Sequence, residues 1–171
     1  MTARQLQQTI IRERLRKAKL VPNYTPKGWW ECDVFEVTAS GYFVEYEVKV
    51  SRSDFFADFG KEMIARRFRW TPPEGVLMEK KHDRLLGDTS PTTPRRFWWV
   101  VPSGLIAPKE IPAGTGLIYV SPRAKGYERF GGVEEVIVPA PDRHRHKMDP
   151  ETVKHALGVC YYRMHALLAK L

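Results

Sequence analysis

The fold is decided by the stretch FVEYEVKVSRSD at residues 43–54, read together with WECDVFEV at residues 30–37. Both stretches are rich in β-branched and aromatic residues, which favour β-strands. Between them, the short segment Ala39-Ser40-Gly41 supplies a tight connection. The two stretches therefore predict an antiparallel hairpin.

Three charged residues of the second predicted strand share one face. Successive side chains of a strand point to opposite faces, so Glu45, Glu47 and Lys49 are expected to lie together. A Glu-x-Lys triplet arises by chance roughly 0.7 times in a chain of this length, and the same residues also fit the solvent-facing side of an ordinary sheet. Spacing alone leaves that interpretation open beside a second one, in which Asp33 on the preceding strand completes a metal-assisted phosphodiesterase site.

The composition indicates one basic domain. A chain of 171 residues with 43% hydrophobic content is long enough for one substantial core, so residues 1–171 are expected to form a single domain. The formal charge of +8 attracts polyanions. Nucleic acid is the expected partner, ahead of an anionic membrane.

Cysteine usage and hydropathy indicate the compartment. Cys32 and Cys160 are too few for a disulfide framework, and the sequence has no Cys-x-x-Cys or His-x-x-x-His pair for zinc. The N-terminal segment lacks the apolar core of a secretory signal, and no run is long enough to span a bilayer. The protein is therefore expected to be cytoplasmic, with no membrane partner and no small-molecule cofactor.

Two helices are predicted in the first half of the chain. Apolar residues recur at helical spacing over residues 4–20, where Glu13 either extends the buried row or lies on the solvated flank. A second helix is expected to begin at the capping box Ser51-Arg-Ser-Asp54 and to weaken at Gly60. Its end carries three arginines, Arg66, Arg67 and Arg69, which suit the negative pole of the helix dipole.

The second half alternates irregular segments with strands. Residues 71–96 are rich in Pro, Gly and Thr and predict an irregular surface insertion. Residues 96–101 and 116–120 predict buried strands, and residues 134–138 a short edge strand. The cationic stretch 143–147 is expected to be exposed.

The last predicted helix covers about residues 150–170. Asp149 is its expected N-cap, and Pro150 suits the first helical position. Seven residues form one stripe that is expected to pack in the core: Val153, Leu157, Cys160, Tyr161, Met164, Leu167 and Leu168.

Four segments carry a resemblance to a known family. They are Asp33, the strand-to-helix passage EVKVSRSDFFADFGK from Glu47 to Lys61, HDR at residues 82–84 and FWWVVP at residues 97–102. Together they cover roughly residues 29–122 and resemble the MmcB-type DNA-repair family of the PD-(D/E)xK nuclease-like superfamily. The chain departs from the family pattern at residues 66–96, where an insertion rich in Pro and Arg replaces a shorter link.

The resemblance implies a fold and a site. The implied fold class is α/β, a restriction-endonuclease-like core with a mixed four- to five-stranded sheet flanked by helices. The implied catalytic residues are Asp33, Glu47 and Lys49, gathered where two central strands diverge, with Glu13 added from the first helix. The expected function is a metal-dependent DNA nuclease in repair or processing. The alternatives are a nucleic-acid-binding module of the same fold that does not cut, and an interaction protein that uses the Pro-rich insertion.

The chemistry expected of these residues is phosphodiester hydrolysis. Hard carboxylate oxygens suit Mg²⁺ or Mn²⁺, so Asp33 and Glu47 are the expected metal ligands. Lys49 is expected to orient or deprotonate the attacking water or to neutralise the transition state. Basic residues expected to contact backbone phosphates are Arg66, Arg67, Arg69, Lys81, Arg95 and Arg96.

Overall fold

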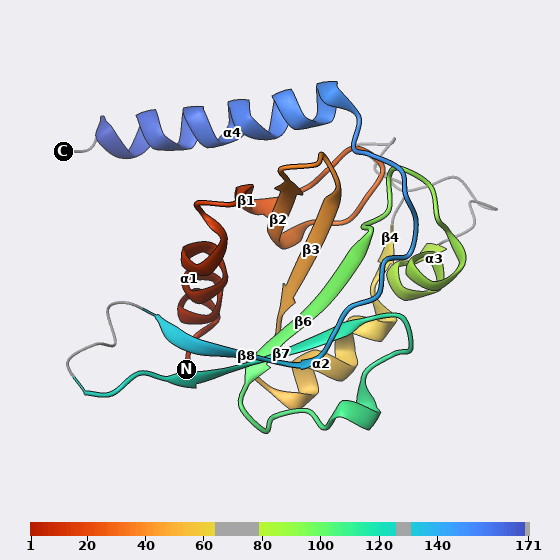
Figure 1. The fold of residues 1–171 in the computed structure, drawn as a ribbon, viewed down its shortest axis with the longest axis vertical. Helices are drawn as coiled ribbons and strands as arrows, with labels where there is room; N and C mark the ends of the chain where they lie inside the picture. Colours follow the sequence, from red (N-terminus) through yellow and green to blue (C-terminus); the bar gives the residue numbers. More distant parts are fainter. Residues whose placement is uncertain (64–78, 126–130, 170–171) are drawn as a thin grey trace.

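A six-stranded mixed sheet forms the centre of the described chain (Figure 1). The structure is a computed structural model that describes residues 1–63, 79–125 and 131–169. The strand order is β1-β2-β3-β6-β7-β8. Strands β3, β6 and β7 are parallel, and the other neighbours are antiparallel. The sheet strands are β1 (Ala18–Tyr24), β2 (Cys32–Thr38), β3 (Phe43–Val48), β6 (Arg96–Pro102), β7 (Gly116–Pro122) and β8 (Gly132–Val138).

Four α-helices accompany the sheet in the described part of the chain: α1 (Ala3–Arg14), α2 (Arg52–Ala57), α3 (Lys81–Gly87) and α4 (Pro150–Leu168). A short 3-10 turn, η1 (Asp58–Gly60), continues α2, and a second, η2 (Pro108–Glu110), precedes β7. Strands β4 (Glu62–Met63) and β5 (Glu79–Lys80) form a separate two-stranded ladder. The mixed sheet with its helices confirms the predicted α/β class.

The predicted hairpin is present as β2 and β3. Their register runs from Val34 opposite Tyr46 to Val37 opposite Phe43. Gly41 makes the turn possible because its φ of +85° lies in the left-handed region that glycine tolerates. The hairpin prediction is therefore confirmed, and with it the alternation of side chains along β3.

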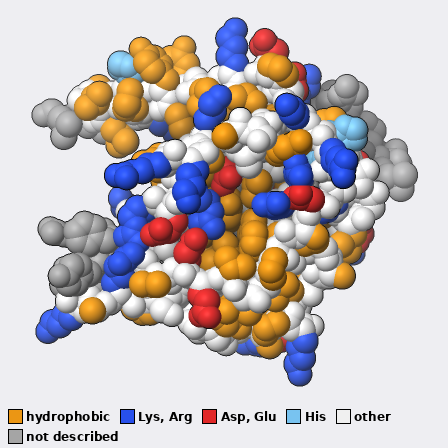
Figure 2. All heavy atoms as spheres, in the orientation of Figure 1, with side chains coloured by type: hydrophobic (Ala, Val, Ile, Leu, Met, Phe, Trp, Pro, Cys, Tyr) orange, Lys and Arg blue, Asp and Glu red, His pale blue; other side chains and the backbone are white. Residues whose placement is uncertain are grey.

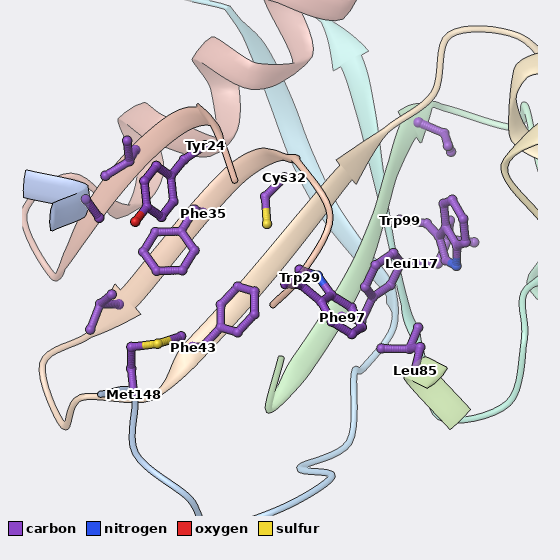
Figure 3. Close-up of a cluster of buried hydrophobic side chains, with 14 of the residues drawn as sticks. Tyr24, Trp29, Cys32, Phe35, Phe43, Leu85, Phe97, Trp99, Leu117 and Met148 are labelled. Carbon is purple, nitrogen blue, oxygen red and sulfur yellow. The ribbon is translucent and has the colours of Figure 1, made fainter. Parts of the chain in front are cut away.

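Each face of the sheet packs its own apolar layer. On one face, Leu6 and Ile10 of α1 contact strand residues that include Val100. On the other face, Phe55 of α2 and Leu85 of α3 pack against a larger aromatic layer, part of which Figure 3 shows. This layer includes Phe35, Phe43, Phe97 and Trp99. The molecule is thus a three-layer sandwich in which α2 and α3 share the face of β3 that carries Glu45 and Glu47.

The first helix is shorter than the sequence predicts. The helix ends at Arg14, and residues 18–24 form β1 instead of continuing the helix to residue 20. Two β1 side chains, Val21 and Tyr24, are buried in the larger apolar layer, which stabilises the strand. Pro22 is tolerated because β1 lies at the sheet edge, where a missing N–H breaks no central ladder. This unforeseen strand raises the sheet to six, so the prediction of four or five strands was too low.

The second half of the insertion and the cationic stretch pack on each other. Residues 79–87 form β5 and α3, while residues 71–78 lie outside the described residues. Arg143 donates hydrogen bonds to the carbonyls of Pro94 and Asp88, and His144 Nε2 lies 3.0 Å from the Thr93 carbonyl. The predicted exposure is confirmed for residues 145–147 and was wrong for Arg143 and His144, because these two side chains contact carbonyls of the neighbouring irregular segment.

The last helix begins as predicted but is packed along only part of its length. Asp149 caps it by accepting a hydrogen bond from the Thr152 amide at 3.0 Å. Ala156 is fully buried, and three further residues pack against the core: Val153, Val159 and Cys160. The rest of the predicted core stripe is exposed. No helix in the described ranges is long and apolar enough to cross a membrane.

Gly116 tests the close packing at the start of β7. A Cβ added there would lie 2.5 Å from Trp98 Cε3 and 2.7 Å from the Ala140 amide. We therefore expect Gly116→Ala to lower the free energy of unfolding by about 1–3 kcal/mol, measured by urea denaturation. The matched control is Gly158→Ala in α4, where no atom lies within 4 Å of the added Cβ. That change is expected to stabilise the helix by up to about 1 kcal/mol, and equal effects of the two substitutions would contradict the packing argument.

Candidate active site

A buried ionic cluster lies against the face of β3 that is covered by α2 and α3. We define the ionic cluster as Glu45, Glu47, Lys49, Asp58, Lys61, Lys81 and His82. All of its members except Lys61 are at most 5% exposed. Burying so many charged groups is unfavourable unless each one is paired, so the pairing pattern decides what the cluster can do.

Short local signals bring the cluster together. Alternation along β3 places Glu45, Glu47 and Lys49 on one face, as the sequence predicts, but this face is buried rather than solvated. Ser51 caps α2 by accepting the Asp54 amide, which turns the chain back over β3. Asp58 follows at the end of this helix and begins η1.

Glu47 is the centre of the cluster. Its Oε1 lies 2.8 Å from Lys49 Nζ and 3.1 Å from Lys61 Nζ, and its Oε2 lies 2.7 Å from Lys81 Nζ. Burial acts to raise the pKa of Glu47, but Lys81, together with Lys49 and Lys61, outweighs it and lowers that pKa. One carboxylate therefore holds three ammonium groups, which come from the residue after β3, the segment after η1, and α3.

Glu45 is held less strongly in its ionised form. Its carboxylate forms an ion pair with Lys81 at 2.7 Å and accepts a hydrogen bond from the Trp29 indole at 2.5 Å. Burial raises the pKa of Glu45 to about 7, with Glu47 adding to the effect and Lys81 opposing it. Glu45 is thus the carboxyl group of the cluster that can exchange a proton near neutral pH.

Asp58 ties the cluster to the aromatic layer. It contacts Lys49 at 2.6 Å, Lys61 at 2.5 Å and His82 Nε2 at 2.8 Å. Burial alone would raise the pKa of Asp58, but the hydrogen bond with His82 and the nearby lysines lower it. The His82 ring stacks on Trp99, with ring centroids 5.3 Å apart. Both Asp58 carboxylate oxygens are therefore fixed.

Asp33 lies beside the cluster where β2 and β3 separate. The ladder between the two strands ends at Val34 and Tyr46, and beyond it the Val48 amide donates to Asp33 Oδ2 at 2.7 Å. Burial raises the pKa of Asp33 to about 6; the charge of Glu47 adds to this, and the Val48 amide opposes it. Gln7 of α1 donates to the Asp33 carbonyl at 3.1 Å and holds the backbone from the other face.

The structure brings three of the four predicted catalytic residues together. Asp33 and Glu47 are close enough for the charge of one to raise the pKa of the other, and Lys49 contacts Glu47. Glu13 does not join them: α1 packs on the opposite face of the sheet, and Glu13 pairs with Arg12 at 2.6 Å. The prediction of a catalytic Glu13 was therefore wrong, and its alternative, a solvated flank, describes its place.

The structure describes three of the six residues that are predicted to contact phosphates. Lys81 was expected on an exposed loop, but its side chain is fully buried between Glu45 and Glu47, so it cannot reach a phosphate. Arg95 and Arg96 are both paired with Asp142 beside a surface pocket of about 280 Å³. Arg96 also borders Val44, a residue of the layer that packs on α1, rather than the ionic cluster. The remaining three, Arg66, Arg67 and Arg69, lie outside the described residues.

Three members of the cluster were not identified as site residues from the sequence. They are Asp58, Lys61 and His82. The available signal was the spacing Asp58-x-x-Lys61 directly after a capped helix, since charged residues three apart lie on one side of a helical turn. His82 had no comparable spacing signal beyond its place in the HDR segment at residues 82–84, because its contact with Asp58 is tertiary.

The fit of a divalent cation can be judged from the carboxylates. Among residues 1–63, 79–125 and 131–169, no three His, Cys, Asp or Glu side chains converge to hold one metal ion. Mg²⁺ keeps several waters, so two protein carboxylates can be enough. Asp33 and Glu47 come from adjacent strands, and Oδ1 of Asp33 has no hydrogen bond within the described part of the chain. The donor set fits Mg²⁺ or Mn²⁺ on condition that a lysine gives up its contact with Glu47.

Lys81 should be the most sensitive residue for stability. Lys81→Met keeps the length of the side chain but leaves Glu45 and Glu47 without their shared cation. We expect this substitution to lower the free energy of unfolding by about 3–5 kcal/mol, measured by chemical denaturation. Lys80→Met is the matched control, because Lys80 is the exposed neighbour and its loss should change stability by less than about 0.5 kcal/mol. Similar losses in both variants would show that the buried pairing does not stabilise the fold.

The raised pKa of Asp33 predicts how one substitution depends on pH. The folded pKa of about 6 lies above the ordinary value of 3.8, so ionised Asp33 destabilises the fold above pH 6. This penalty disappears as the folded state takes up a proton between pH 6 and 4. Asp33→Asn should therefore be more stable than the parent at pH 7.5, by up to about 3 kcal/mol for two pKa units. The advantage should shrink towards pH 4. Urea denaturation of both proteins at several pH values checks this, and a difference that is constant with pH would refute it.

Comparison with known proteins supports the fold and leaves the activity open. Neither the family models nor the curated proteins searched give a match. Among solved structures, the chain is similar to SPO1766, a protein of unknown function from Silicibacter pomeroyi. The TM-score is 0.60 and the sequence identity 21%, over 98% of this chain and 91% of that one. At this level of identity the likeness shows the α/β fold with its mixed sheet.

Proposed function

We propose that this chain is a metal-dependent DNA nuclease with a restriction-endonuclease-like core, acting in DNA repair or processing. One observation carries the proposal: the Asp33 carboxylate binds the Val48 amide at the point where β2 and β3 separate. Val48 lies between Glu47 and Lys49, so this bond holds the carboxylate of one strand beside the Glu-x-Lys of the next. The formal charge of +8 supports DNA as the substrate.

In this proposal Asp33 and Glu47 hold Mg²⁺ or Mn²⁺. When bound, the ion supplies a Lewis acid that lowers the pKa of a coordinated water and neutralises charge on the phosphate. Lys61 is the lysine best able to make room for it, because its side chain is 47% exposed, whereas Lys49 and Lys81 are buried. A raised pKa of about 6 at Asp33 fits the same role, since it marks a carboxylate that lacks a cation of its own.

Lys49 is proposed to act on the substrate side of Glu47. Its Nζ lies 2.8 Å from Glu47 Oε1 and 2.6 Å from Asp58 Oδ1, so two carboxylates fix its position. From there the ammonium group would hold a non-bridging phosphate oxygen or the attacking water by a hydrogen bond. It would also compensate the negative charge that develops in the transition state.

A second candidate function is a nucleic-acid-binding module of the same fold that does not cut. The observation in its favour is the charge balance of the ionic cluster: three lysines, Lys49, Lys61 and Lys81, face three carboxylates. Such a network is neutral without any added ion and can serve as a structural brace. The two functions differ in whether a divalent ion displaces Lys61 from Glu47.

Plasmid nicking separates the two functions. We expect the protein to nick supercoiled DNA with Mg²⁺ or Mn²⁺ and to stop when the metal is chelated. Asp33→Ala and Lys49→Ala should each reduce the rate by at least about 100-fold, and circular dichroism should confirm that both variants remain folded. Glu13→Ala, on the opposite face, is the matched control and should cut at the parental rate.

Two other results of the nicking assay would contradict the proposed nuclease. Nicking that persists in both folded variants would refute the proposed site. Salt-sensitive DNA binding without metal-dependent nicking would support the binding module instead, because phosphate contacts weaken as salt rises.

A further inference from the structure

Helix α4 extends beyond the sheet (Figure 1), and several of its apolar side chains from Leu157 onward are exposed. Figure 2 shows these side chains gathered on the projecting helix, apart from the basic groups on the body. Six large apolar residues of α4 are between 41% and 74% exposed: Leu157, Tyr161, Tyr162, Met164, Leu167 and Leu168. Residues that are merely scattered on a surface need no explanation, but a contiguous group of this size does.

The spacing within this group points to another helix as its partner. Leu157, Tyr161, Met164 and Leu168 are separated by four, three and four residues, which is the repeat of a helix-to-helix seam. The opposite side of α4 already has its partners, because Ala156 packs in the core and Arg163 donates to the carbonyls of Pro22 and Asn23. The helix therefore has one occupied side and one unoccupied seam. We call these four residues the outer seam of α4.

The charge of the segment selects among possible partners. Residues 157–169 contain a single charged side chain, Arg163, and its guanidinium is engaged by the two backbone carbonyls of β1. DNA would find no free cation there. A helix that lies on a membrane surface carries a strongly charged polar face, which this segment lacks. An uncharged, apolar surface of the same kind fits best, and the outer seam of a second copy provides it.

The exposed area sets the strength of such a pairing. From their exposed fractions, the six residues offer roughly 600 Å² per copy, of which the four residues of the outer seam supply about two thirds. A standard interface buries about 800 Å² per partner, so two copies joined through their outer seams would form a small interface of the size found in weak, reversible complexes. The seam spans about three turns, or roughly 17 Å of helix. Since the four residues of the seam are uncharged, pairing the seams would not bring like charges of the seam residues face to face.

We infer that two copies of this chain associate through the outer seams of their α4 helices, as a two-fold symmetric pair. The same surface on each copy contacts its counterpart, as expected of an isologous dimer. Because the area is modest, the dissociation constant should be on the order of micromolar. This inference does not depend on the proposed nuclease activity, since none of the residues of the ionic cluster takes part in it.

Sedimentation velocity between 1 and 100 µM tests the inference. The parent chain should shift from monomer to dimer over this range. The double substitution Tyr161→Glu and Leu168→Glu should weaken association at least 10-fold, because it would bring carboxylates face to face in the seam, while circular dichroism should stay unchanged. Leu86→Glu is the matched control: Leu86 is 57% exposed on α3, outside the seam, and its loss should leave the dimer intact.

Two results would overturn the inference. One is a parent chain that stays monomeric at 100 µM. If such a monomer floats with phosphatidylcholine vesicles and the double variant does not, the seam binds a membrane instead of a second copy. The other is dissociation of the dimer by Leu86→Glu with no effect of the double substitution, which would place the interface elsewhere on the molecule.

Discussion

The contact between Lys81 and the two glutamates of β3 is the interaction on which the rest of the structure depends. A single buried ammonium group lies 2.7 Å from both Glu45 and Glu47. It joins the central strand to α3, an element that lies more than thirty positions further along the chain. Without this cation, two carboxylates would be buried side by side, which a folded protein does not sustain. The aromatic layer under α2 and α3 can pack only because each buried charge beside it has an oppositely charged partner.

The pairing of carboxylates with lysines also explains why the carboxyl groups of one site have such different pKa values. Glu47 and Asp58 each have several cationic neighbours, and their pKa values are lowered. Asp33 and Glu45 have fewer, and burial raises their pKa values to about 6 and about 7. Of these four neighbouring carboxyl groups, Glu47 and Asp58 stay ionised, whereas Asp33 and Glu45 can change their protonation state as the pH changes. Such separation is characteristic of sites that exchange protons or cations.

Local sequence patterns predicted the centre of the fold well and its periphery poorly. The β2–β3 hairpin, the caps at Ser51 and Asp149 and the shared face of Glu45, Glu47 and Lys49 all follow from short-range rules. Strand β1 was missed because its residues continue a helical spacing, and only pairing with β2 decides in favour of the strand. The predicted catalytic role of Glu13 was wrong for a related reason, because tertiary packing decides which face of the sheet a helix covers. Asp58 had only the spacing Asp58-x-x-Lys61 as a local signal, and His82 joined the site through a tertiary contact with Asp58.

Helix α4 also has a consequence for the outer edge of the sheet. Strand β1 carries backbone carbonyls that an unpaired edge would offer to any extended peptide nearby. Side chains of α4 occupy several of them, since Cys160 reaches the Leu20 carbonyl and Arg163 those of Pro22 and Asn23. Asn23 adds a left-handed kink with φ of +49°, and Pro22 contributes no amide. The helix therefore protects the edge strand from pairing with a strand of another molecule. Truncating the chain before residue 160 would remove this protection and expose an edge prone to fibrous aggregation.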